Sequence, residues 1–302
     1  MSSINRVATA NMYDNSIRNI GGRQNALVEL NEKLTPGNRV LRASDDPVAA
    51  AQAERAITRM ERIKVEQEAL SLQRNIMAES ESSLGNAVDL LQQMRELFIS
   101  AGNGANGPKE MPIIAGQLRT LRNELLSVSN RTDTNGVPLL SALGSAVTPF
   151  LNSSIFNGLP GQQGSNNTSL PSSLDGNMAF ILDSGNSLFD ELDAAINGIS
   201  NALSGSDANQ SSVIQNGLAS LDQGMDRLSA LRGFAGDMLN RADRITGDQE
   251  VRSIQLETDR SRAEDMDLVK GISDFQQTQV GYQAALQSYA MVQKLSMFNY
   301  IS

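Results

Sequence analysis

QSYAMVQKLSMFNYIS, residues 287–302, is apolar and aromatic almost throughout, although chain termini are usually polar and frayed. From 275 to 302 the only charged side chain is Lys294. From Leu268 to Phe298 a stripe of residues recurs every three or four positions and is apolar except for Gln279, which predicts a helix with one apolar stripe. Because such a helix has almost no charged face to turn to water, we expect it to be surrounded by protein on most sides.

Residues 4–34 predict a second helix with a similar stripe. Its stripe positions alternate spacings of four and three, the pattern of a coiled-coil seam, with polar Gln24 and Asn31 as interruptions. The four tyrosines all fall in these two terminal segments. We therefore expect the terminal helices to pair and to form an assembly interface. The predicted interface residues are Tyr13, Ile17, Ile20, Leu27, Leu34, Ile272, Phe275, Tyr282, Leu286, Tyr289, Val292, Leu295 and Phe298.

Long helices are predicted between the two ends. Asp46-Pro47 supplies an N-cap followed by proline at the first helical position, so a helix is expected from about 47 to 100. Further long helices are expected at about 109–130 and 208–260. Five apolar residues of the first one lie seven positions apart, as in a packed helix pair: Leu70, Met77, Leu84, Leu91 and Phe98.

Residues 139–186 differ in composition, since they are rich in turn-forming and polar residues. Met178–Leu182 predicts a strand, and Ser187 with Asp190 resembles a capping box at the start of a short helix. The expected fold is mainly α: an elongated chain with terminal helices paired in a coiled coil, a long-helix bundle, and a small β-containing or irregular tip domain. The predicted domains are a terminal coiled-coil core (1–45 with 265–302), a helical bundle (46–135 with 207–264) and a variable outer domain (136–206).

The negative charge is concentrated in one segment. Residues 132–226 contain nine acidic residues and no Lys or Arg, whereas the remainder holds 25 basic and 25 acidic residues. The net charge of −9 therefore belongs to this segment. An acidic centre argues against nucleic acid or an anionic membrane as a partner, and it also keeps a domain soluble.

Several kinds of chemistry are excluded by composition. The chain has no Cys and no His, which rules out disulfides, thiolate nucleophiles, Cys/His metal sites and an imidazole base. We expect no catalytic, cofactor-binding or metal-binding residues. No apolar stretch reaches the length of about 18 residues that a membrane helix requires. The start, MSSINRVATANMYDN, lacks the apolar region of a cleavable secretory signal.

Three local patterns have a chemical and a structural interpretation. Gly102, Gly104 and Gly107 match the dinucleotide pattern G-x-G-x-x-G, but a predicted helix precedes them, which favours a loop between helices. The acidic segment 261–267 favours a capped junction between helices over a metal or acid/base site. Lys294 is expected to extend to the edge of a helix bundle, although a lysine of lowered pKa can act as a nucleophile.

Two segments resemble the signatures of a known family. KLTPGNRVLRASDDPVAAAQA (33–53) and ALQSYAMVQKLSMFNYIS (285–302) resemble the ends of bacterial flagellar hook-associated proteins of the hook–filament junction type. SRAEDMD (261–267) is similar to the segment before the last helix in these proteins and in flagellins. The resemblance covers about 1–135 and 210–302, and it makes the expected fold flagellin-like.

The resemblance implies a non-enzymatic structural adaptor without cofactors. It implies export by the flagellar type III apparatus without a cleaved signal, with a cytoplasmic chaperone on the C-terminal region before export. It further implies an extracellular, homo-oligomeric annular layer on hook-associated protein 1, on which flagellin polymerises.

Two alternatives remain open at this point. A flagellin-type filament subunit shares the helical signatures, although the LSMFNYIS ending favours the junction type over the Leu-Leu-Arg-like ending typical of flagellins. An enzyme or surface binder that uses the central segment would require a deep pocket lined by Asp175, Asp183 or Asp190.

Overall fold

The computed structural model describes residues 2–103, 109–143, 146–151, 155–161, 168–201 and 207–301, and the side chains within them except those of 2–10, 207–210, 292 and 294–301. The helices are α1 (Ser2–Leu34), α2 (Pro47–Gly102), α3 (Met111–Ser129), α4 (Gly176–Phe180), α5 (Leu188–Asn201), α6 (Asp207–Glu264) and α7 (Leu268–Ile301). The mainly α prediction is confirmed, because each expected long helix is present with its ends shifted by only a few residues.

The chain forms two compact units. The first unit contains residues 1–62 and 251–302, and the second contains 63–250. Helices α2 and α6 contribute to both units, because each boundary between the units falls inside one of these helices. The division into three domains at other boundaries stays a prediction.

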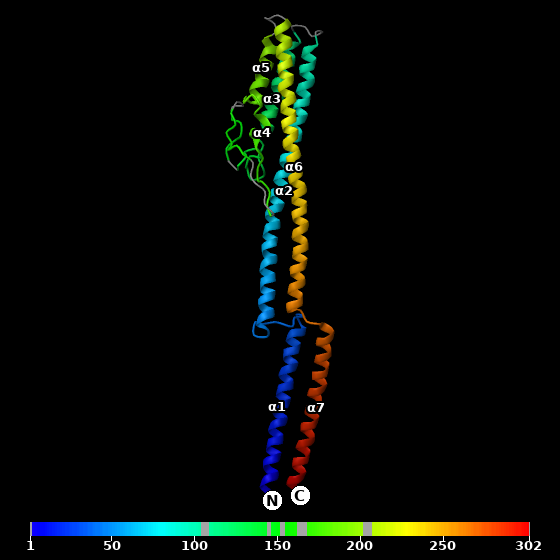
Figure 1. The fold of residues 1–302 in the computed structure, drawn as a ribbon. Helices are drawn as coiled ribbons and strands as arrows, with labels where there is room; N and C mark the ends of the chain where they lie inside the picture. The colour runs from blue at the N-terminus through cyan, green and yellow to red at the C-terminus, as the bar shows by residue number, and fades with distance from the viewer. Residues whose placement is uncertain are drawn as a thin grey trace. The chain divides into compact units, whose positions relative to one another are not determined.

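The first unit contains the two terminal helices, α1 and α7, which lie side by side with both chain ends at the same end of the pair (Figure 1). Helix α1 ends where Gly37 takes a left-handed conformation, with φ of 77°, so that the Asn38 N–H donates to the Lys33 carbonyl. Helix α7 begins after Asp267, whose carboxylate accepts the backbone N–H groups of Val269 and Lys270.

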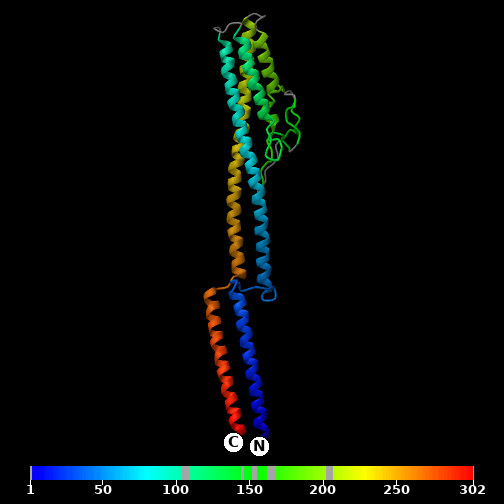
Figure 2. The same cartoon turned by 180° about the vertical axis from the view of Figure 1, so that it is seen from behind.

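The second unit has a core of long helices, in which α3 and α5 lie against α2 and α6 (Figures 1 and 2). The heptad positions of α2 predicted from the sequence are confirmed as core, since none of the five is more than 1% exposed. Helix α6 has a matching heptad series of buried residues: Leu221, Leu228, Ala235, Ala242 and Gln249. Ion pairs between α2 and α6 border this seam, as between Arg74 and Asp243 at 3.0 Å.

Gln249 is the polar member of the α6 series. It is 4% exposed, and neither its Oε1 nor its Nε2 atom has a hydrogen-bond partner. A buried polar group without a partner costs about 1–3 kcal/mol, so Gln249→Leu is expected to raise the free energy of unfolding by about 1–2 kcal/mol. Urea denaturation followed by circular dichroism measures this change. The matched control Gln223→Leu, at an exposed position of α6, is expected to stay within about 0.5 kcal/mol of the parent, and a destabilised Gln249→Leu chain would contradict the argument.

The described residues of 139–186 pack along the side of the long helices rather than beyond their ends. Leu170 joins Leu70 and Ala242 in a buried cluster, and its N–H donates to the Gln73 side chain at 2.9 Å. Phe150, Phe180 and Phe189 form a ring cluster with centroids 5.3–5.4 Å apart. This contact ties the segment to α5 and to the main core.

The strand predicted at Met178–Leu182 is wrong, because most of this run lies in helix α4. The Asp175 carboxylate accepts the Asn177 N–H and caps the helix, a local contact that competes with extended pairing. Gly176 packs tightly against Leu140, because an added Cβ would lie 2.6 Å from the Leu140 carbonyl oxygen.

The cap predicted at Ser187, at the start of helix α5, is confirmed, since the Ser187 hydroxyl accepts the N–H of Phe189 at 3.1 Å.

Candidate assembly interface

The predicted interface residues lie on the two helices of one pair, α1 and α7. Tyr13 and Tyr289 meet across the pair with ring centroids 5.2 Å apart, and their hydroxyl groups form a hydrogen bond. That hydrogen bond raises the pKa of the Tyr289 hydroxyl. The predicted pairing of the terminal helices is therefore present in the first unit.

The pair does not bury its own stripes. None of the predicted interface residues with a described side chain is fully buried. Ile17, Ile272 and Leu286 are 49%, 50% and 41% exposed, a large fraction for apolar side chains at the seam of a helix pair. The side chains of Val292, Leu295 and Phe298 lie outside the described part. The assembly role of the whole set stays a prediction.

The structure adds residues to this surface that the predicted interface set did not contain. Further exposed apolar side chains on the pair are Met12, Val28, Leu268, Val269, Val280 and Met291.

A groove of about 770 Å³ also runs between α1 and α7 and is lined largely by small residues, among them Gly22, Ala26, Gly281 and Ala285. Their four-residue spacing on each helix was a sequence signal for this groove. A Cβ at Gly281 would clash with the guanidinium of Arg23 in the same groove.

Segment 33–53, before the long helices, and segment 261–267, after them, meet in the first unit. The backbone N–H groups of Arg39 and Val40 donate to the Glu264 carbonyl at 2.7 and 3.3 Å, and the Met266 N–H donates to the Gly37 carbonyl at 2.8 Å. The Arg39 guanidinium also donates to the Ala263 carbonyl at 2.8 Å. Segments more than 220 residues apart in sequence are thus joined at the base of the terminal helix pair.

Charged groups at this junction serve local structure. Arg260 pairs with Glu257, Glu264 and Asp265, which raises the pKa of Arg260, while the hydrogen bond from Arg260 lowers the pKa of Glu257. The Ala49 N–H donates to the Asp46 carboxylate at 3.0 Å, which confirms the predicted N-cap of α2. This hydrogen bond also lowers the pKa of the Asp46 carboxyl. The junction interpretation of 261–267 is confirmed.

The acidic residues named for a possible pocket have structural partners instead. Asp175 is buried and accepts the N–H groups of Gly161 and Asn177. Asp183 forms an ion pair with Arg227. Within the described residues, no group of three acidic side chains is placed to hold a metal ion, and no helix is long and apolar enough to cross a membrane.

Two other patterns fall partly outside the described residues. Gly102 ends helix α2, whereas Gly104 and Gly107 lie outside the described part. The side chain of Lys294 also lies outside it. The long helix that precedes Gly102 is not the strand that a dinucleotide site requires.

Comparisons with known proteins agree with this arrangement. Residues 7–144 match the bacterial flagellin N-terminal helical region. Flagellar hook-associated protein 3 of Escherichia coli K12 is 22% identical over 97% of this chain and 98% of its own length. Flagellin of Bacillus subtilis is 25% identical over 90% of both chains. The crystal structure of the flagellar junction protein FlgL from Legionella pneumophila aligns with a TM-score of 0.56 and 16% identity, covering 64% of this chain and 99% of that one. The chain is therefore similar to flagellar hook-associated protein 3 over nearly its whole length, and it has a fold of the flagellar junction type.

Proposed function

We propose that this chain is a non-enzymatic structural component of the bacterial flagellum that forms the junction layer between hook and filament. The observation that supports this most is its similarity to hook-associated protein 3 over nearly the whole length of both chains. The half-exposed stripes of α1 and α7 fit such a role, because apolar surface that one chain leaves uncovered can be buried by neighbouring copies.

The proposal includes the partners of this layer. The chain forms a homo-oligomeric annulus that rests on hook-associated protein 1 and carries flagellin. It reaches the cell exterior through the flagellar type III apparatus without a cleaved signal, after a cytoplasmic chaperone has protected its C-terminal region. The interface consists of the stripes on α1 and α7, and nucleic acid, membrane and cofactors have no part in it.

A filament subunit of the flagellin type is the second candidate, and the 25% identity to a flagellin over 90% of the chain favours it. Immunogold electron microscopy of flagella from the source bacterium separates the two. We expect label in one short zone at the base of each filament, and a deletion strain that has hooks but releases flagellin into the medium. Label along the whole filament would instead identify a filament subunit, and flagella without label would contradict both candidates.

A further inference from the structure

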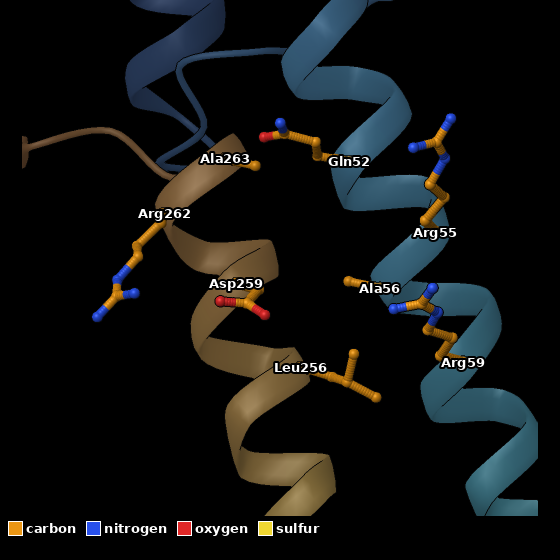
Figure 3. A pocket seen from close by; sticks show the side chains of 8 residues that line it. All are labelled: Gln52, Arg55, Ala56, Arg59, Leu256, Asp259, Arg262 and Ala263. Carbon is orange, nitrogen blue, oxygen red and sulfur yellow. The ribbon is translucent and has the colours of Figure 1, made fainter.

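A second groove of the first unit lies between the start of α2 and the end of α6 (Figure 3). It has a volume of about 430 Å³, and its apolar floor is formed by Ala56, Leu256 and Ala263, which are all buried. We call it the arginine groove, because it is also lined by Arg55, Arg59 and Arg262.

The three arginines are available to a partner. All three are exposed, and among the described residues none of them forms a hydrogen bond or an ion pair. Arg55 and Arg59 project from α2, whereas Arg262 projects from α6 (Figure 3). Asp259 is the acidic residue that lines the groove, so the lining has a net charge of +2. We therefore expect the groove to attract a surface that carries carboxylates beside apolar side chains.

The outward face of α2 is such a surface. At 3.6 residues per turn, six residues fall on one side of this helix, opposite the buried Ile63, and we call them the glutamate stripe: Glu54, Thr58, Glu61, Val65, Glu68 and Leu72. The three glutamates are exposed, and their carboxylates form no hydrogen bond or ion pair within the part of the chain that the structure describes. Val65 and Leu72 are 65% and 50% exposed. The basic neighbours Arg62 and Lys64 lie at the two borders of the stripe rather than on it.

We propose that the arginine groove of one copy binds the glutamate stripe of a second copy of this chain. The two surfaces are complementary in charge and in apolar area. Val65 lies on the apolar floor, while Glu61 and Glu68, one turn to either side of Val65, meet the arginines. Guanidinium groups suit this contact, because they can hold a carboxylate through two parallel hydrogen bonds.

The contact can repeat from copy to copy. The groove and the stripe lie on different sides of α2, so one copy can use both at once. Because the two surfaces differ, the contact is heterologous, and it closes into a ring where the rotation between copies allows it. The inference deepens the proposed function and rests on it, since it adds a contact between copies to that of the terminal helices.

Sedimentation velocity of the purified full-length chain measures the contact. We expect the chain to associate, and the association to weaken as ionic strength rises, because salt screens exposed charges. Arg59→Glu is expected to weaken the association about tenfold, since it places a carboxylate opposite the glutamates of the stripe. The matched control Arg244→Glu makes the same charge change at an exposed position of α6, more than three turns from the groove lining, and is expected to leave the association unchanged.

Exchange of the two charges between copies tests whether groove and stripe meet each other. Glu61→Arg alone is expected to weaken the association about as much as Arg59→Glu does, because the reversed stripe then faces the arginines. In an equimolar mixture of the two variants, each reversed groove can meet a reversed stripe. We therefore expect the mixture to associate more tightly than either variant alone, and a mixture no tighter than the single variants would contradict the proposal.

A photo-crosslinker locates the partner surface. Thr58→p-benzoylphenylalanine places the probe on the glutamate stripe, on the side of α2 that faces away from α6 in its own copy. A mixture of ¹⁴N and ¹⁵N chains distinguishes links between copies from links within one copy. We expect mixed-isotope links to residues 256–263 of α6.

The remaining outcomes decide against the contact. Links to other segments, links within one copy only, no association of the parent chain, or equal effects of Arg59→Glu and Arg244→Glu would each overturn the proposal. Immunogold labelling of flagella tests the proposed function separately, so either proposal can fail alone.

Discussion

Leu286→Asp is expected to abolish incorporation of the chain into the junction layer while leaving the second unit folded. Leu286 lies on the stripe of α7 and is 41% exposed in the single chain, so its substitution disturbs few contacts within one copy. In the assembly we expect neighbouring helices to cover it. Burial of an unpaired carboxylate then costs several kcal/mol, and each loss of about 1.4 kcal/mol lowers an association constant tenfold.

The measurement is the amount of variant chain in flagella isolated from a strain that lacks the parent protein. Two controls separate an interface effect from a general one. Leu286→Met keeps an apolar side chain of similar volume and is expected to assemble. Asn240→Asp adds the same charge at an exposed position of α6 in the second unit and is expected to assemble as well. Normal filaments built with Leu286→Asp would show that this stripe is not the assembly interface.

Phe189→Ala is expected to cause the largest loss of stability, about 3–5 kcal/mol, in the second unit. Phe189 is fully buried, stacks on Phe180 with centroids 5.3 Å apart, and meets Phe150 at 5.3 Å. The guanidinium of Arg122, which forms an ion pair with Asp193 at 2.7 Å, lies 5.5 Å from the Phe189 ring centroid. The substitution therefore leaves a cavity and removes the aromatic contact of a largely buried cation.

Urea denaturation of parent and variant, followed by circular dichroism, gives this difference in free energy. Met178→Ala is the control, because Met178 belongs to the same region but is 56% exposed, and we expect a change within about 0.5 kcal/mol. A loss below about 1 kcal/mol for Phe189→Ala would mean that the ring cluster contributes little to the core.

The helices of this chain could be predicted from sequence because their signals are local. The heptad series from Leu70 to Phe98 is fully buried as expected, and the caps at Asp46 and Ser187 form as predicted. Spacing along a helix depends on residues within one or two turns, so no knowledge of distant segments was needed. The α6 series that ends at Gln249 follows the same rule and was equally accessible from the sequence.

The remaining features depend on contacts between distant segments. Met178–Leu182 has strand-like composition, but the Asp175 cap and the close approach of Gly176 to Leu140 make most of it helical. No periodicity shows that Gly37 and Met266 share a hydrogen bond, or that Arg59 and Arg262 border one groove.

By itself, the sequence determined that this protein is helical, that its two ends pair, and that it contains no Cys or His chemistry. Those properties follow from residue types and their spacing. Only the tertiary structure decided that the pair leaves its stripes half exposed, and that Arg55, Arg59 and Arg262 border one groove in the first unit. The physical reason is that exposure and unpaired charge are set by which segments come together in space.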